Sequence, residues 1–249
     1  MIEAVALTPS ELTIAVFTVF LAGIVRGFSG FALSALIMAS LVLILPPVHL
    51  IPICTLLELS ASAMLVRGGY ADADKKLVLG LQSGALIGVP VGLYMTTTLD
   101  PVTSRTLALG LILVLATLQL ARVRLPADGA MATTFVTGII SGFATGIASI
   151  GGMVIALYTL ARSMPAKAVR GSLILVILIG GSLSVIYQTA FGMMNGTAAL
   201  RALVLVLPTL AGVYLGRAMF TPKYESYYRP FCLTLLMGLA LLGLVRSAL

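Results

Sequence analysis

Long uncharged runs separated by short polar connectors make up most of the chain. In chain order, the ten runs cover residues 12–25, 31–45, 48–66, 77–98, 103–121, 130–147, 150–161, 168–190, 202–220 and 227–245. Most of them approach the roughly 20 apolar residues that one helix needs to cross a bilayer. The pattern therefore predicts an all-α membrane protein whose chain crosses the membrane several times.

The runs fall into two sets with the same order of lengths. Residues 12–25 and 31–45 form a short pair, each about 22 Å long as a helix, which is less than the ~30 Å hydrocarbon layer. Three longer runs follow, and after the polar connector 122–129 the order repeats. We expect two repeats in one integral membrane domain, residues 1–124 and 125–249. Each would be a short-helix (re-entrant) hairpin followed by three transmembrane helices, with two full crossings as the alternative to each hairpin.

Matching residues in the two halves indicate a duplication. Shifted by 115 positions, Gly23 and Gly27 coincide with Gly138 and Gly142. Shifted by 124 positions, Gly88, Gly92 and Arg105 coincide with Gly212, Gly216 and Arg229. Leucine matches are expected by chance in so apolar a chain, whereas glycine and arginine matches are not, so the chain contains an internal repeat.

Charged residues are scarce, and their positions orient the chain. Only 9% of residues are charged, against about 25% in soluble domains, which excludes a soluble globular protein. If each short pair returns to its starting side, one face receives most basic residues, and the other receives only Arg105, Arg201 and Arg246. The rich face then holds Arg67, Lys75, Lys76, Arg122, Arg124, Arg162, Lys167, Arg170, Arg217, Lys223 and Arg229.

The positive-inside rule makes that basic face cytoplasmic, because the other arrangement divides the basic residues evenly between the two faces. Both termini are then predicted to be periplasmic. Each repeat crosses the membrane an odd number of times, so the two repeats are inverted relative to each other. Inverted repeats with broken helices near the membrane midplane are typical of secondary transporters.

The remaining chemical groups exclude several classes of protein. His49 is the one histidine, and Cys54 and Cys232 lie in separate apolar runs, so we expect no metal site, no cofactor and no disulfide framework. The net charge of +7 comes from residues in short loops and does not indicate nucleic-acid binding. One histidine and one acid inside an apolar run supply few general acid–base partners, so we do not expect an enzyme.

Two glycine-rich breaks, residues 26–30 and 141–152, form the candidate site for a small anionic substrate. A half-helix that starts at such a break directs free N–H groups and its positive dipole end toward the midplane. The predicted binding residues are Arg26, Gly27, Ser29, Gly30, Thr145, Ser149, Gly151 and Gly152. Glycines let a ligand reach the backbone, hydroxyls donate hydrogen bonds, and Arg26 adds a charged fork of donors. The alternative is that the glycines only allow close helix packing and that Arg26 snorkels to an interface.

Glu58 is the one acid inside an apolar run. Its carboxyl group could take up and release a proton and so couple transport to a proton gradient. A structural carboxyl group, neutral or paired with Arg26, is the alternative. Gln82, Gln119 and Gln188 lie near the ends of runs, where we expect them to form hydrogen bonds between helices.

These residues carry a family resemblance. The duplicated apolar unit, the run Ser-Gly-Phe-Ala-Thr-Gly-Ile-Ala-Ser-Ile-Gly-Gly over 141–152 and Ala-Val-Arg-Gly-Ser over 168–172 resemble the TauE/SafE family of sulfite exporters. The resemblance covers nearly the whole chain and implies a permease for sulfite, sulfonates or related organosulfur anions in the bacterial inner membrane. The chain departs from the family where Met153 follows Gly151-Gly152 in place of a third glycine, and where a proline is absent a few residues later. These departures concern the substrate rather than the fold.

The resulting prediction is a secondary transporter that exports a small organosulfur anion, coupled to protons through Glu58, by alternating access at the repeat interface. Its partners are the small anionic substrate and the lipid bilayer. The alternative is a passive anion channel or an importer of another small oxyanion or carboxylate.

Overall fold

The computed structural model describes residues 6–123, 129–162, 164–219 and 225–248, and all regular elements within them are α-helices. The first five are α2 (Pro9–Ser29), α3 (Leu33–Leu41), α4 (Pro47–Gly69), α5 (Lys75–Thr98) and α6 (Pro101–Leu120). The other five are α7 (Met131–Ala148), α8 (Gly151–Ala161), α9 (Ala166–Ala190), α10 (Gly196–Ala218) and α11 (Glu225–Ala248). The ten helices correspond one to one to the ten apolar runs, which confirms the all-α prediction.

Local sequence signals explain where several helices begin. Thr8 and Glu11 form a capping box at the start of α2, and Pro9 occupies the first turn. The side chains of Asp74 and Asp100 accept backbone hydrogen bonds at the starts of α5 and α6. The polar connectors therefore end one apolar helix and cap the next.

Among the described residues, seven helices are long and apolar enough to cross a membrane, namely α2, α4, α5, α6, α7, α9 and α10. In contrast to the expectation of two short runs in each pair, α2 has 21 residues and α7 has 18, and only α3 and α8 are short, with nine and eleven. For α2 the difference arises because Arg26, read from the sequence as part of a break, lies in the last turn of the helix. Its charge has a partner inside the protein and does not interrupt the helix.

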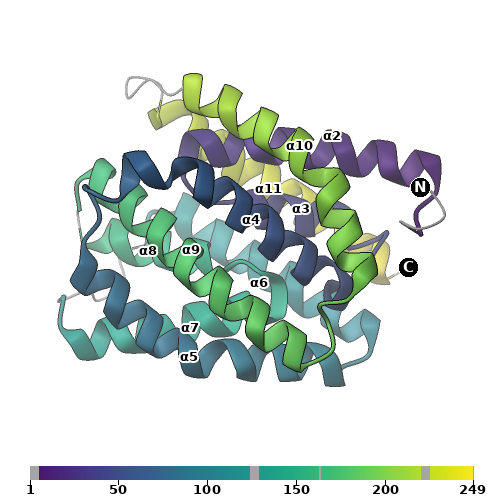
Figure 1. The fold of residues 1–249 in the computed structure, drawn as a ribbon, viewed down its shortest axis with the longest axis horizontal. Helices are drawn as coiled ribbons and strands as arrows, with labels where there is room; N and C mark the ends of the chain where they lie inside the picture. The colour runs from purple at the N-terminus through teal and green to yellow at the C-terminus, as the bar shows by residue number, and fades with distance from the viewer. Residues whose placement is uncertain (1–5, 124–128, 163, 220–224, 249) are drawn as a thin grey trace.

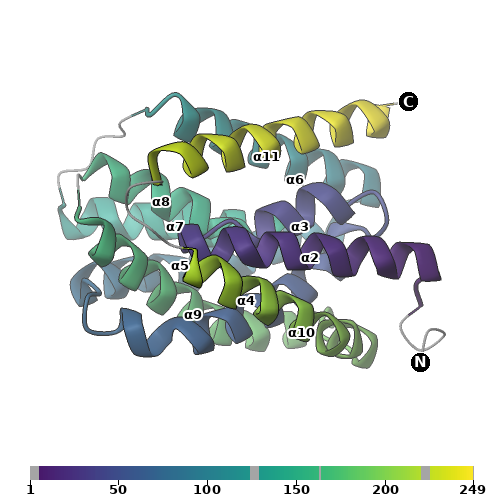
Figure 2. The same cartoon turned by 90° about the horizontal axis from the view of Figure 1, so that it is seen from above.

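The helices form layers around the two short ones (Figures 1 and 2). In Figure 1, α2 and α10 lie along one edge of the molecule and α5 and α7 along the opposite edge. In Figure 2, α6 and α11 cover one side, α4 and α9 cover the other, and α3 and α8 lie between them. Eight of the nine residues of α3 are buried, as is expected of a helix that is apolar on all faces. The N-terminal end of α2 and the C-terminal end of α11 lie at the same end of the bundle (Figure 2).

Glycines allow α5 and α7 to touch backbone to backbone. A Cβ atom at Gly84 or Gly88 would collide with the carbonyl oxygen of Phe135 or Ile139, respectively. At Gly142 it would lie 2.9 Å from the Cα atom of Ala85. The contacts advance along both helices in the same direction, so α5 and α7 are parallel, and small residues at four-residue spacing permit their close approach.

The pair α2 and α10 repeats this arrangement. A Cβ atom at Gly23 would lie 3.2 Å from the Cα atom of Gly212, and one at Gly27 would collide with the carbonyl oxygen of Val213. At Gly216 the obstruction is the carbonyl oxygen of Ile24. The first helix of each half therefore packs closely against the fourth helix of the other half.

We expect Gly88→Val to destabilise the fold by at least about 2 kcal/mol, because its side chain has no space between α5 and α7. Gly110→Val in α6 is the matched control, since a Cβ atom there meets nothing within 4 Å. Thermal unfolding of the detergent-purified protein, followed by far-ultraviolet circular dichroism, measures both variants. Equal losses in the two variants would contradict the packing argument.

Candidate functional site

Each long-helix and short-helix pair turns through residues with left-handed backbone conformation. Helix α2 ends at Gly30 (φ 80°), whose N–H donates to the Arg26 carbonyl oxygen, and Ala32 (φ 75°) precedes α3. Helix α7 ends at Ser149 (φ 58°), whose N–H donates to the Thr145 carbonyl oxygen, and α8 begins two residues later. We call residues 30–32 the first tip and residues 149–150 the second tip. Both short helices start at these tips, inside the bundle.

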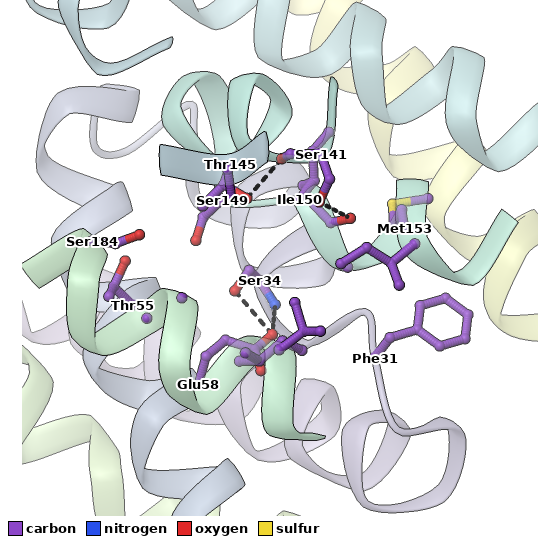
Figure 3. Close-up of a pocket in the computed structure, with 18 of the residues that line it drawn as sticks. Phe31, Ser34, Thr55, Glu58, Ser141, Thr145, Ser149, Ile150, Met153 and Ser184 are labelled. Carbon is purple, nitrogen blue, oxygen red and sulfur yellow. Dashed lines mark hydrogen bonds between the residues drawn. The ribbon is translucent and has the colours of Figure 1, made fainter. Parts of the chain in front are cut away.

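The first turns of α3 and α8 line one cavity of about 70 Å³ (Figure 3). Helices α4, α5, α7 and α9 supply the rest of its wall. Its polar lining residues are Ser34, Thr55, Glu58, Gln82, Ser141, Thr145, Ser149 and Ser184. The volume suits a small polyatomic ion, because one water molecule needs about 10–15 Å³ by the same kind of measure.

The first turn of α8, which follows the second tip, has backbone donors beside this cavity. At Gly151 a Cβ atom would collide with Thr145 Oγ1 and the Ser141 carbonyl oxygen, so only glycine fits. At Gly152 a Cβ atom would have room, with Ile177 Cδ1 at 3.6 Å and Phe31 Cβ at 3.9 Å. Because both residues belong to the first turn of α8, their N–H groups have no carbonyl partner within the helix. They can donate to an anion in the cavity.

A buried hydroxyl group adds a donor that does not depend on the helix end. Ser184 of α9 is 1% exposed, and its Oγ atom has no hydrogen-bond partner among the described residues. Figure 3 shows the hydroxyl oxygens of Ser34, Ser149 and Ser184 facing the same space. A buried polar atom without a partner is costly, so a ligand or water in the cavity would stabilise it.

A buried ion pair supports the α3 side of the cavity. Arg26 is fully buried, and its Nε atom lies 2.9 Å from Glu58 Oε2. Arg26 Nη2 also donates to Ser62 Oγ at 2.9 Å. Glu58 Oε1 accepts hydrogen bonds from the Ser34 N–H at 3.3 Å and the Ser34 hydroxyl at 3.1 Å. The structure thus contains the pairing of Glu58 with Arg26 that the sequence left as an alternative.

Five of the nine residues singled out from the sequence line the cavity, namely Glu58, Thr145, Ser149, Gly151 and Gly152. Arg26 is not among the lining residues and lies behind Glu58.

The remaining three lie near the end of α2. Gly27 packs on α10, and its carbonyl oxygen accepts a hydrogen bond from Arg170 Nη2 at 2.8 Å. A Cβ atom at Gly30 would lie 3.2 Å from Arg170 Cγ. The Ser29 side chain lies outside the described residues.

The sequence analysis missed Ser34, Thr55 and Ser184 as lining residues. Ser34 could have been found, because it lies in the first turn after a predicted break, whereas Thr55 and Ser184 come from the interiors of long helices. The expectation for the three glutamines is confirmed, because each donates from Nε2 to a neighbouring helix. Gln82 donates to the Val176 carbonyl oxygen (2.6 Å), Gln119 to that of Met153 (3.0 Å) and Gln188 to Thr55 Oγ1 (2.8 Å).

We expect Arg26→Leu to lower the free energy of unfolding by about 3–5 kcal/mol, because it leaves the Glu58 carboxylate buried without its counter-charge. The double variant Arg26→Leu/Glu58→Leu should regain much of this loss, since it buries no charge. Arg67→Leu, at an exposed arginine in the last turn of α4, is the control. A double-mutant cycle of thermal unfolding in detergent measures the coupling, and simple additivity would show that the pair does not act as a unit.

Comparison with known proteins gives one match. The chain matches the family described as sulfite exporter TauE/SafE over residues 15–242. No curated protein and no solved structure matches the chain. The match covers nearly the whole chain and agrees with the seven apolar helices of membrane-spanning length. This multi-pass membrane protein belongs to the TauE/SafE family of sulfite exporters.

Proposed function

We propose that the chain is a secondary transporter that exports sulfite, a sulfonate or a related small organosulfur anion across the bacterial inner membrane. The observation that carries the proposal is the cavity where the N-terminal turns of α3 and α8 meet the buried Ser184 hydroxyl group, which has no partner in the described part of the chain. Membership in a family of sulfite exporters supports both the chemical class of the substrate and the direction of transport.

The anion would bind at the second tip. A helix N-terminus stabilises a nearby negative charge by about 0.3–2 kcal/mol, and more donors add to this in a site removed from water. Gly151, Gly152 and Ser184 provide such donors. Arg26 would act indirectly by neutralising Glu58, which would otherwise repel an anion from the cavity.

Alternating access is proposed to come from movement of two inverted repeats, residues 1–124 and 125–249. The packing of the helices supports this division. Helix α5 of the first half packs against α7, the first helix of the second half, and α10 of the second half packs in the same way against α2, the first helix of the first half. Helices α4 and α9, and likewise α6 and α11, contact each other and occupy corresponding places in the two halves. A cavity between such repeats is the usual position of a transporter's substrate site.

We propose that proton coupling depends on Glu58, whose carboxyl group is the one titratable side chain among the described residues that line the cavity. An ionisable group at this depth is costly and is usually retained for function. The pH dependence of sulfite binding in the wild-type chain and in Glu58→Gln tests this assignment.

We expect Ser184→Ala to weaken sulfite binding about ten- to a hundredfold, because a hydrogen bond to a charged group contributes roughly 1.5–3 kcal/mol. Gly152→Ala should weaken binding about tenfold, because its methyl group would obstruct the N–H groups of α8 without displacing neighbouring atoms. Titration calorimetry measures binding, and counterflow of labelled sulfite in proteoliposomes measures transport.

Two matched controls accompany these variants. Ser182 lies on the same helix as Ser184 but is exposed, and its hydroxyl donates to the Leu178 carbonyl oxygen. Gly110→Ala adds a methyl group where nothing lies within 4 Å. Unchanged sulfite affinity in both cavity variants would show that the anion binds elsewhere. Sulfite flux without counterflow would favour a passive channel.

The proposed orientation rests on the distribution of basic residues. The N-terminal end of α2 and the C-terminal end of α11 lie together (Figure 2), at the end of the bundle opposite to the loop between α4 and α5, which is flanked by Arg67, Lys75 and Lys76. We expect alkaline phosphatase fused after residue 249 to be active in a bacterial host and green fluorescent protein fused there to be dark. The reverse pattern would contradict the proposed periplasmic termini.

A further inference from the structure

The hydroxyl group of Ser34 has a fixed direction. An ionised carboxylate only accepts hydrogen bonds, so the proton of Ser34 Oγ points to Glu58 Oε1, 3.1 Å away. The same oxygen faces the cavity (Figure 3), where it can offer only its lone pairs. Glu58 therefore turns Ser34 into a hydrogen-bond acceptor for any ligand.

Other groups on this wall are also acceptors. Thr55 uses its proton on the Ile51 carbonyl oxygen (2.9 Å) and already accepts from Gln188 Nε2 (2.8 Å). Glu58 is ion-paired with Arg26 on its far oxygen, and its side chain retains 11% exposure. The α3–α4 wall of the cavity, formed by Ser34, Thr55 and Glu58, thus presents oxygen lone pairs, including those of a carboxylate.

Lining groups of α8 and α9 can act as donors. These are the N–H groups of Gly151 and Gly152 and the Ser184 hydroxyl group, which has no partner among the described residues. A fully deprotonated oxyanion would satisfy these donors but would place a lone pair against Ser34 and Glu58. Facing acceptors repel each other and leave buried oxygens unsatisfied.

We propose that the cavity binds its oxyanion in the monoprotonated form, with the ligand O–H donating to Ser34 Oγ and Glu58 Oε1. The unprotonated ligand oxygens would accept from Gly151, Gly152 and Ser184. This inference rests on the proposed function and adds that the transported proton travels on the ligand, while Glu58 keeps its ion pair with Arg26. Glu58 then acts as a positioning residue that sets the direction of the Ser34 hydroxyl.

The titratable and charged groups around Glu58 do not provide another source of this pH dependence. From α2, the group that faces Glu58 is the guanidinium group of Arg26, its ion-pair partner. On α4 itself, Cys54 is fully buried. The described lining residues of α3, α5, α7, α8 and α9 carry no titratable side chain.

The test compares sulfite with methanesulfonate on the wild-type chain by titration calorimetry across pH. Hydrogensulfite can present an O–H group, whereas methanesulfonate has the same charge and three oxygens but no O–H group. Above the pH at which hydrogensulfite loses its proton, we expect the affinity for total sulfite to fall about tenfold per pH unit. Methanesulfonate should bind at least about tenfold more weakly than hydrogensulfite, with no gain at acid pH.

Any other result contradicts either this inference or the proposed function. If sulfite affinity does not depend on pH, the inference is wrong. It is also wrong if methanesulfonate binds more tightly at acid pH and the protein takes up a proton on binding. In both cases the proposal that the cavity binds an anion remains valid. If sulfite does not bind at any pH, the proposed function itself fails.

Glu58→Gln provides a second readout. The glutamine amide can donate to Ser34 and so release the Ser34 hydroxyl group to donate to a dianion. We expect the pH dependence of sulfite binding to flatten in this variant. Asp100→Asn, an acid-to-amide change at an exposed helix cap where asparagine caps equally well, should retain the wild-type dependence. If Glu58→Gln does not fold, the ligand comparison on the wild-type chain still decides.

Discussion

A helix that ends inside an apolar bundle leaves backbone N–H and C=O groups that need partners from the protein or a ligand. This protein contains two such breaks, at the two tips, and the groups that satisfy them shape the surrounding structure. At the end of α2, the Gly30 N–H donates to the Arg26 carbonyl oxygen and Arg170 donates to that of Gly27. At the start of α3, the Ser34 N–H donates to the Glu58 carboxylate. Protein groups therefore satisfy these backbone groups at and around the first tip.

The ion pair between Arg26 and Glu58 makes this solution possible. A carboxylate placed at the start of α3 is favoured by the helix dipole, but burying it alone would be costly. Arg26 supplies the counter-charge from the last turn of α2, and Ser62 accepts a further hydrogen bond from its guanidinium group. One interaction thus holds α2, α3 and α4 together and keeps a charged group at the cavity wall without a net charge there.

Much of this architecture could be predicted from local sequence, and the remainder depends on contacts between distant helices. The ten helices, the two breaks and the glutamine hydrogen bonds follow from runs of apolar residues and the polar groups at their ends. The direction of the Arg26 side chain could not be predicted, because a guanidinium group at a break could face either the ligand or Glu58. The packing of α4 against α2 determines that it faces Glu58. For the same reason the position of Ser184 at the cavity could not be predicted, because Ser184 lies in the middle of an apolar helix and only the packing of α9 brings it there.

The two tips differ in the group that satisfies the short helix, and this asymmetry supports the proposed site. At α3 the negative partner is the carboxylate of Glu58. At α8 the corresponding first turn consists of Gly151, Gly152 and Met153, and Glu58 is the one acid among the described residues that line the cavity. The start of α8 therefore lacks the partner that the start of α3 has, while glycine leaves its backbone open to approach. An oxyanion in the cavity would accept hydrogen bonds from the first turn of α8, as the Glu58 carboxylate does from the first turn of α3. The contact between Glu58 and α3 is therefore an example, within the protein, of the interaction proposed for the substrate.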